Sequence, residues 1–189
     1  MIIKRSIAGA AFAIVANVAS SAELQPVDPI SARIFLELHT IQSLSANIGP
    51  LVSAPGEAFR VIDGDFLALG NLRIRLVGIE APKAAQQCNA SNGSSWDCVT
   101  QSSDRVRNIL RNAERVECFS SEQGNYGLYF ASCEADGRDM GGLLVEEGLA
   151  WPDQDQGYYL AEATTAQAEG TGIWQAYTQP PWEWRMERH

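Results

Sequence analysis

Two closely spaced turns between apolar residues constrain the fold of this chain more than any other feature. Asp63-Gly64 separates the apolar segment that ends near Val61 from the segment 66–69, and Asp-Gly in such a position is a strong short-range signal of a β-hairpin. Gly70-Asn71 marks a second turn, and residues 72–79 (LRIRLVGI) have the composition of a third strand. The sequence therefore predicts a meander of three β-strands at the start of a folded domain.

Helical and strand patterns alternate after this meander. Apolar residues with helical spacing predict helices at 98–112, 139–150 and 158–168. Two strands are predicted at 116–121 and 128–133, on either side of a loop rich in turn residues. The resulting order is β-β-β-α-β-β-α-α. We therefore expect an α+β fold in which five strands form a small OB-type barrel accompanied by three helices.

Residues 1–22 have the three parts of a secretory signal peptide. Lys4 and Arg5 form a short basic start, residues 7–19 are apolar, and small residues precede a cleavage position after Ala22. A membrane anchor is the alternative, but the apolar run is shorter than the roughly 20 residues that a span requires. We therefore predict a periplasmic or secreted protein whose mature form has no membrane segment.

Three further segments follow the predicted signal peptide. Residues 23–56 form an N-terminal segment, in which apolar residues at intervals of three and four predict an additional amphipathic helix at 30–48. Residues 57–178 form the folded domain, and residues 179–189 form a Trp-rich C-terminal tail. The helix at 30–48 can pack on the domain or bind a partner, and the sequence leaves both roles open.

The chain has four cysteines, and an even number in an exported protein predicts disulfides. Four cysteines allow three connectivities, and a zinc site is disfavoured because no ligand pairs stand at short spacing. In the predicted hairpin, Cys118 faces Cys133 if Glu122 faces Tyr129, and facing residues on neighbouring strands are close enough for a bridge. Sequence distance favours the pairs Cys88–Cys98 and Cys118–Cys133.

The chain is acidic, with 14 Lys and Arg against 23 Asp and Glu, and its formal net charge is −9. Removal of residues 1–22 takes away two basic and no acidic residues, which leaves 12 against 23 and a charge of −11. Tight binding to nucleic acid without sequence preference depends on Lys and Arg that neutralise phosphates. The net charge therefore disfavours nucleic acid as a partner.

Asp65, Arg75 and Glu80 lie within 16 residues, on strands and turns of one meander. Carboxylate oxygens bind hard cations such as Ca²⁺, and an arginine offers a planar fork to phosphate oxygens. Together these residues could hold a cation beside a phosphate. The alternative is that the acidic residues only form turns and that the arginine is a solvated strand residue.

The segment VIDGDFLALGNLRIRLVGIEAPK (61–83) resembles the signature of the thermonuclease family, the staphylococcal-nuclease-like phosphodiesterases with an OB fold. The cysteine pairs and the PPWEWR ending resemble exported bacterial members. The resemblance covers roughly 57–185 and implies Ca²⁺-dependent cleavage of DNA and RNA if the catalytic residues are present. Further matches follow in chain order at NYG (125–127), EADG (134–137), LLVEEGLAW (143–151) and GIW (172–174).

The resemblance also assigns roles to single residues. Asp65 and Glu80 stand at the two calcium-binding aspartates of the family, and Arg75 stands at the first of two phosphate-binding arginines. Lys83 stands where the family has the glutamate that orients or deprotonates the attacking water, and Leu128 replaces the second arginine. Since an ammonium group cannot accept that proton and leucine carries no charge, the resemblance implies a degenerate site with weak or absent Ca²⁺ binding.

Lys83 is expected to pair with Asp65 or Glu80 and so to fill the calcium position with its own ammonium group. The favoured function is an exported thermonuclease-like binding or accessory module, whose partner the sequence does not identify. One alternative is an active or weakly active Ca²⁺-dependent nuclease, with Asp63 holding the attacking water. The other is an OB barrel that binds an oligosaccharide or a protein.

Overall fold

The computed structural model describes residues 49–155 and 157–187. The predicted signal peptide at 1–22 and the predicted helix at 30–48 lie outside these residues. None of the helices in the described part of the chain combines the length and apolar character that a membrane span requires.

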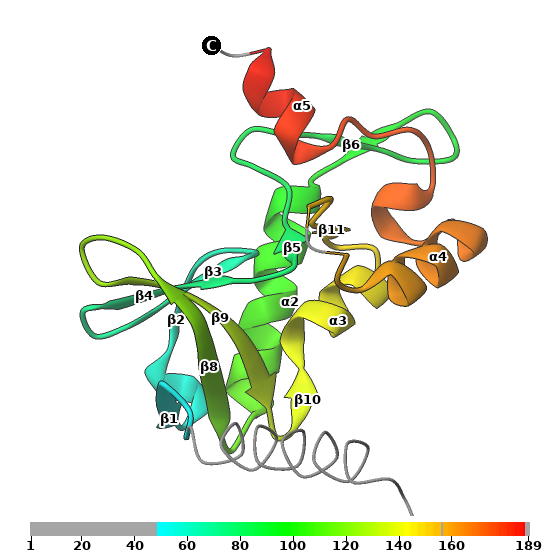
Figure 1. The fold of residues 1–189 in the computed structure, drawn as a ribbon. Coiled ribbons are helices and arrows are strands. Elements are labelled where there is room, and N and C mark those ends of the chain that lie inside the picture. The colour runs from blue at the N-terminus through cyan, green and yellow to red at the C-terminus, as the bar shows by residue number, and fades with distance from the viewer. Residues whose placement is uncertain (1–48, 156, 188–189) are drawn as a thin grey trace, which may run out of the picture. The chain divides into compact units, whose positions relative to one another are not determined.

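A curled mixed sheet forms half of a barrel (Figure 1), which confirms the predicted α+β, OB-type fold. Its strand order is β1-β8-β9-β4-β3-β2, and β10 pairs with β9. All neighbouring strands are antiparallel except β4 and β9, which run parallel. The strands are β1 (Val52–Ala54), β2 (Arg60–Asp63), β3 (Phe66–Leu69), β4 (Leu72–Leu76), β8 (Val116–Gln123), β9 (Leu128–Ala135) and β10 (Arg138–Asp139).

Strands β2, β3 and β4 form the predicted meander, with turns at the two predicted positions. The third strand ends at Leu76 and not at Ile79, which belongs to a separate short strand. The fully buried side chains of Leu67 and Ile74 stand in register on β3 and β4. Gly64 is required at the first turn because a Cβ there would lie 2.2 Å from Ser102 Oγ and 2.8 Å from Ala81 Cβ. The turn therefore packs directly against a helix and against the segment that follows the meander.

The hairpin of β8 and β9 carries the predicted disulfide between Cys118 and Cys133, which stand opposite each other in the register. The prediction that Glu122 faces Tyr129 is wrong by one residue, because Glu122 pairs with Phe130. The register shifts between Ser120 and Glu122, as it does at a β-bulge, where one strand contributes an extra residue. The bulge lies beyond the disulfide, so the cysteine register is unaffected.

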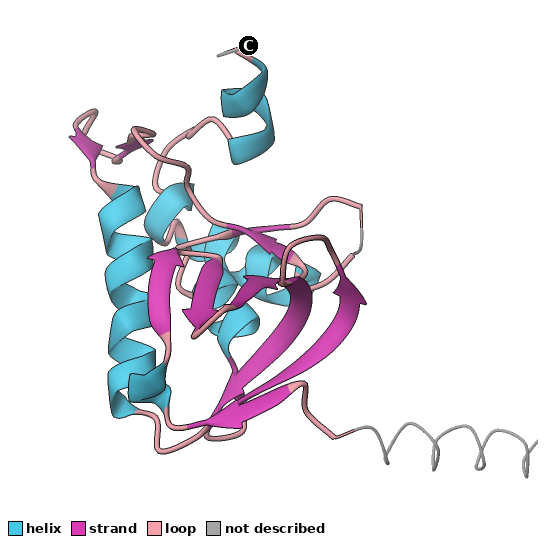
Figure 2. Cartoon of the chain, turned by 90° about the vertical axis from the view of Figure 1, so that its left-hand side faces the viewer, coloured by secondary structure: helices cyan, strands magenta, loops and turns pink. Residues whose placement is uncertain are grey.

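The first helix, α2 (Cys98–Asn112), has the predicted bounds and runs along one side of the sheet (Figure 2). Asp97 caps it by accepting a hydrogen bond from the Thr100 N–H at 3.0 Å. The apolar positions Val106, Ile109 and Leu110 are buried, as the helical spacing requires. A single 3-10 turn, η1 (Gly56–Ala58), lies between β1 and β2 and contacts this helix.

Helices α3 (Met140–Glu146) and α4 (Leu160–Glu169) correspond to the two other predicted helices and are shorter than expected. Asp139 caps α3 and also accepts a hydrogen bond at 2.8 Å from the hydroxyl of Tyr159, just before α4. The segment predicted as a tail contains another helix, α5 (Pro181–Met186), with Pro181 at a first-turn position where its missing N–H costs nothing.

Four short strands and a second 3-10 turn complete the fold. Strand β5 (Ile79–Glu80) pairs with β11 (Trp151–Pro152), strand β6 (Cys88–Asn89) pairs with β7 (Ser95–Trp96), and η2 is Gly172–Trp174. The main core lies between the sheet, α2 and α3. A second core surrounds the predicted Cys88–Cys98 disulfide, which is present, and includes Trp151 and Ile173 with Trp96, Trp174 and Trp182 packed against it.

We expect the Cys118–Cys133 bridge to stabilise the domain by restricting the unfolded chain. Its sequence separation of 15 predicts a loss of about 3 kcal/mol in the free energy of unfolding for the Cys118→Ser/Cys133→Ser variant. Urea denaturation of the oxidised proteins measures this loss. Cys88→Ser/Cys98→Ser is the matched control for the second core, and an unchanged denaturation midpoint in the first variant would contradict the expectation.

Candidate functional site

Asp65, the first predicted calcium ligand, is almost completely buried, with 1% of its surface exposed. It ends the first turn of the meander, immediately before β3. Its backbone carbonyl accepts a hydrogen bond at 2.9 Å from the N–H of Leu76 on β4. The strand pairing therefore fixes the backbone that carries this carboxylate.

A single oxygen of Asp65, Oδ2, accepts hydrogen bonds from three donors. Lys83 Nζ lies at 2.6 Å, the backbone N–H of Ala81 at 3.1 Å and Arg75 Nη2 at 3.3 Å. The predicted ion pair of Lys83 is thus formed with Asp65 and not with Glu80. Lys83 Nζ thus makes the shortest of the three contacts to this carboxylate.

The backbone of Lys83 is held by Gln86, a residue that the sequence did not single out. The N–H of Lys83 donates to Gln86 Oε1 at 2.9 Å, and Gln86 Nε2 donates to the carbonyl of Gln179 at 2.6 Å. Gln86 is 1% exposed and all its amide contacts are to backbone groups. A buried glutamine has no signature in local sequence, so only the fold identifies this positioning role.

Glu80, the second predicted calcium ligand, is paired with the C-terminal helix α5. Both Glu80 oxygens accept from Arg185, Oε2 from Nη1 by a short contact and Oε1 from Nη2 at 3.1 Å. This hydrogen bonding raises the pKa of Arg185, and the charges of Glu80 and Asp65 act in the same direction. Arg185 is therefore a charged part of this cluster that the sequence-based assignment missed.

Asp63, the alternative candidate for holding the attacking water, stabilises the turn in which it lies. Its Oδ1 accepts a hydrogen bond at 2.8 Å from the N–H of Gly64. Burial raises the pKa of Asp63, and the negative charge of Asp65 adds to the rise, while Gly64, Lys83 and Arg75 oppose it. These contacts place three acidic and three basic side chains in one cluster, which we call the Asp65 cluster: Asp63, Asp65, Glu80, Arg75, Lys83 and Arg185.

Leu128 begins β9 and stands in register with Arg73 of β4. Arg73 and Arg75 alternate with the buried Ile74, so both arginines and Leu128 lie on the sheet face away from the core. Arg73 is exposed, and its side chain has no hydrogen bond or ion pair among the described residues. The position predicted to have lost an arginine is thus occupied by an apolar side chain, opposite the exposed Arg73.

The donor set does not fit a calcium ion. Ca²⁺ takes six to eight oxygen ligands, whereas here the Asp65 carboxylate accepts from two cationic side chains and Glu80 is occupied by Arg185 on both oxygens. Across residues 49–155 and 157–187, no three acidic, histidine or cysteine side chains are grouped closely enough to hold a metal. The cations Lys83 and Arg185 supply the positive charge instead.

Comparison with known proteins identifies the relatives of this chain. The family model described as "Staphylococcal nuclease homologue" matches residues 73–176, a range that includes Arg75, Glu80, Lys83 and Leu128 but not Asp65. The chain is also similar to the succinoglycan biosynthesis protein ExoI of Rhizobium meliloti (strain 1021), with 32% identity over 120 residues. This match covers 61% of the chain and 62% of ExoI, so the chain spans less than two thirds of that relative.

The Lys83→Met variant should lose about 3 kcal/mol of unfolding free energy, because it leaves a buried carboxylate without its shortest partner. The matched control is Arg185→Met, whose more exposed pair should contribute less than about 1 kcal/mol. Adding Asp65→Asn to Lys83→Met should restore most of the loss, since the buried charge is then gone. Urea denaturation at pH 7 measures all three, and equal losses in the two single variants would contradict the assignment.

Proposed function

Because the chain belongs to the staphylococcal nuclease homologue family, we propose that it is an exported member in which phosphodiester hydrolysis has been lost and whose fold serves as a binding or accessory module. The observation that carries this proposal is the 2.6 Å contact between Lys83 Nζ and Asp65 Oδ2. It supports the proposal because the family resemblance assigns Lys83 to the position of the general base and Asp65 to that of the first calcium ligand, and here the two side chains contact each other.

The expected loss of rate is large. General base catalysis contributes about 10²–10⁴ in rate, and one positioned donor that stabilises charge contributes about 10²–10³. Lys83 replaces the base and Leu128 replaces one such donor, so the two changes together remove several powers of ten, although such effects are not additive. The retained Arg75 donates to Asp65 and is itself only one of the groups that the reaction needs.

Export is supported by the disulfides. Both predicted pairs are formed and the described residues contain no free cysteine. Disulfides persist in the periplasm and outside the cell and are rare in the cytosol. Together with the signal-peptide pattern at 1–22, this favours a periplasmic or secreted protein.

A saccharide partner is the second candidate function, and the relative favours it. ExoI is named as a protein of succinoglycan biosynthesis, and the match to it covers 61% of this chain. The net charge of −9 also disfavours a nucleic acid. We therefore infer that the module binds a saccharide in preference to a polynucleotide.

Calcium should not stabilise the protein. A ligand that binds only the folded state adds ~2.7 kcal/mol at a hundredfold excess over its Kd, and an intact calcium site would therefore raise the melting temperature clearly. We expect a change of less than about 1 °C in a thermal melt with low-millimolar CaCl₂, matched for ionic strength with MgCl₂. A clear rise that depends on Ca²⁺ and is lost in Asp65→Asn would contradict the proposal.

The oxidised protein should not degrade DNA in the presence of Ca²⁺. The comparison protein is Lys83→Glu/Leu128→Arg, which restores the base and the second arginine, with its folding checked by circular dichroism. Arg75→Gln is the control for traces of activity that do not come from this site. Hydrolysis by the unmodified protein at a rate near that of the double variant, and abolished by Arg75→Gln, would establish an active nuclease and overturn the proposal.

A further inference from the structure

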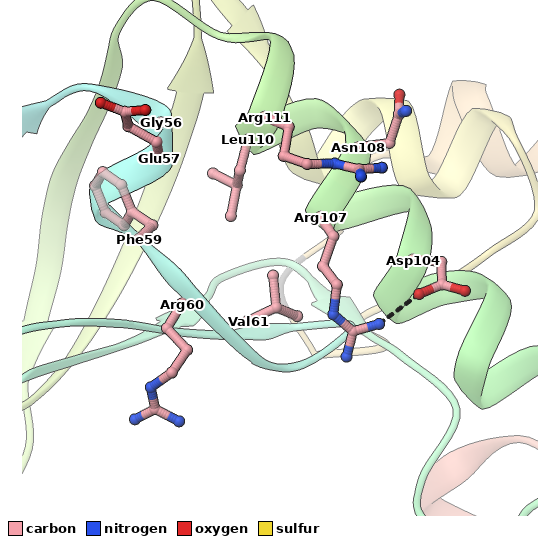
Figure 3. A pocket seen from close by; sticks show the side chains of 10 residues that line it. All are labelled: Gly56, Glu57, Phe59, Arg60, Val61, Asp104, Arg107, Asn108, Leu110 and Arg111. Carbon is pink, nitrogen blue, oxygen red and sulfur yellow. Dashed lines mark hydrogen bonds and ion pairs between the residues drawn. The ribbon is translucent and has the colours of Figure 1, made fainter.

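A groove outside the Asp65 cluster lies between α2 on one side and η1 with β2 on the other. Its volume is about 700 Å³, within the usual range of ligand-binding clefts. Figure 3 shows its lining side chains, none of which belongs to the Asp65 cluster. The residues that carry its chemistry are Arg60, Arg107, Arg111, Glu57, Asp104 and Asn108.

Three arginines line this groove in a chain that has only 14 basic residues. Arg107 pairs with Asp104 at 2.5 Å, whereas the side chains of Arg60 and Arg111 have no hydrogen bond or ion pair within the described part of the chain. Arg107 and Arg111 are one helical turn apart, and like charges at this spacing are destabilising on their own. Because Asp104 already pairs with Arg107, the side chains of Arg60 and Arg111 are the two positive charges of the lining without an ion pair among the described residues, and they favour a negatively charged ligand.

The groove also contains hydrogen-bond acceptors and an apolar floor. Glu57 and Asp104 add two carboxylates to the lining, Phe59, Val61 and Leu110 are its apolar residues, and Val61 lies between Arg60 and Arg107 in Figure 3. A polyphosphate has no alcohol hydroxyl groups for these carboxylates and no C–H faces for the apolar residues. A saccharide that bears a carboxylate offers a negative charge to the arginines, hydroxyl donors to the acidic side chains, and C–H faces to the apolar floor.

The backbone fixes the shape of the groove at one end. Gly56 donates a hydrogen bond to the carbonyl of Ala113 at 3.3 Å, and a Cβ at Gly56 would lie 2.0 Å from the carbonyl oxygen of Leu110. No other residue therefore permits this close approach of η1 to the end of α2. The groove is built into the packing of two elements and does not depend on the orientation of one surface side chain.

We propose that this groove binds an acidic oligosaccharide, with Arg60 and Arg111 as the residues that recognise its carboxylates. This inference rests on the proposed function, because it gives the saccharide candidate a site and a ligand class. The structure separates the groove from the Asp65 cluster, so saccharide binding does not require any residue of the degenerate site.

The test is calorimetric titration of the oxidised protein with trigalacturonate, with maltotriose as the neutral saccharide and inorganic pyrophosphate as the anion without hydroxyl groups. We expect trigalacturonate to bind, and maltotriose and pyrophosphate to bind at least tenfold more weakly. Arg60→Gln and Arg111→Gln should each weaken trigalacturonate binding at least about tenfold, since each removes a hydrogen bond to a charged group. Arg138→Gln is the matched control, because it removes an exposed arginine outside the groove and should change nothing.

Three results would overturn the inference. One is the absence of trigalacturonate binding, and another is binding that the groove variants leave unchanged. The third is tighter binding of pyrophosphate that both groove variants weaken, which would make the groove a phosphate site. Each can occur while the nuclease assay remains negative, so failure of the groove proposal is distinguishable from failure of the proposed loss of hydrolysis.

Discussion

The Asp65 carboxylate is buried in the domain, and the surrounding structure depends on its neutralisation. A buried charge is strongly destabilising unless it is paired and hydrogen-bonded. Here one oxygen accepts from β4 through Arg75 and from the following segment through the backbone of Ala81 and the ammonium group of Lys83. The first turn of the meander, the third strand and the segment after β5 are therefore fixed relative to one another by a single acceptor atom.

The same requirement for charge neutralisation extends to the C-terminal segment. Glu80 pairs with Trp151 across the β5–β11 ladder. Its carboxylate is neutralised by Arg185, which lies 105 positions further along the chain. Gln86, which holds the backbone of Lys83, donates to Gln179 just before α5. Two contacts thus fasten this segment to the cluster, which gives a physical reason why residues 181–186 form a helix packed on the domain and not a tail.

The sequence predicted those structural features that are determined by residues close together in the chain. The Asp63-Gly64 turn, the bounds of α2 and the facing of Cys118 and Cys133 follow from turn chemistry, helical spacing and strand alternation. Three features could not be predicted in this way: the bulge between Ser120 and Glu122, the pair of Glu80 with Arg185, and the groove between α2 and η1 with β2. A bulge depends on the balance between strand pairing and loop geometry, and the other two bring together residues that are far apart in the chain.

The distribution of charge within the domain separates the two candidate sites. In the Asp65 cluster, three cations stand beside three carboxyl groups and the most buried of these carboxylates accepts from two of them, so little positive potential is left for an incoming anion. In the groove between α2 and η1 with β2, three arginines stand beside two carboxylates, and within the described part of the chain only the Arg107 side chain among them forms an ion pair. Since charges that are already paired attract a third charge weakly, this distribution supports the proposal that an anionic ligand binds in the groove and not at the position that family resemblance first indicates.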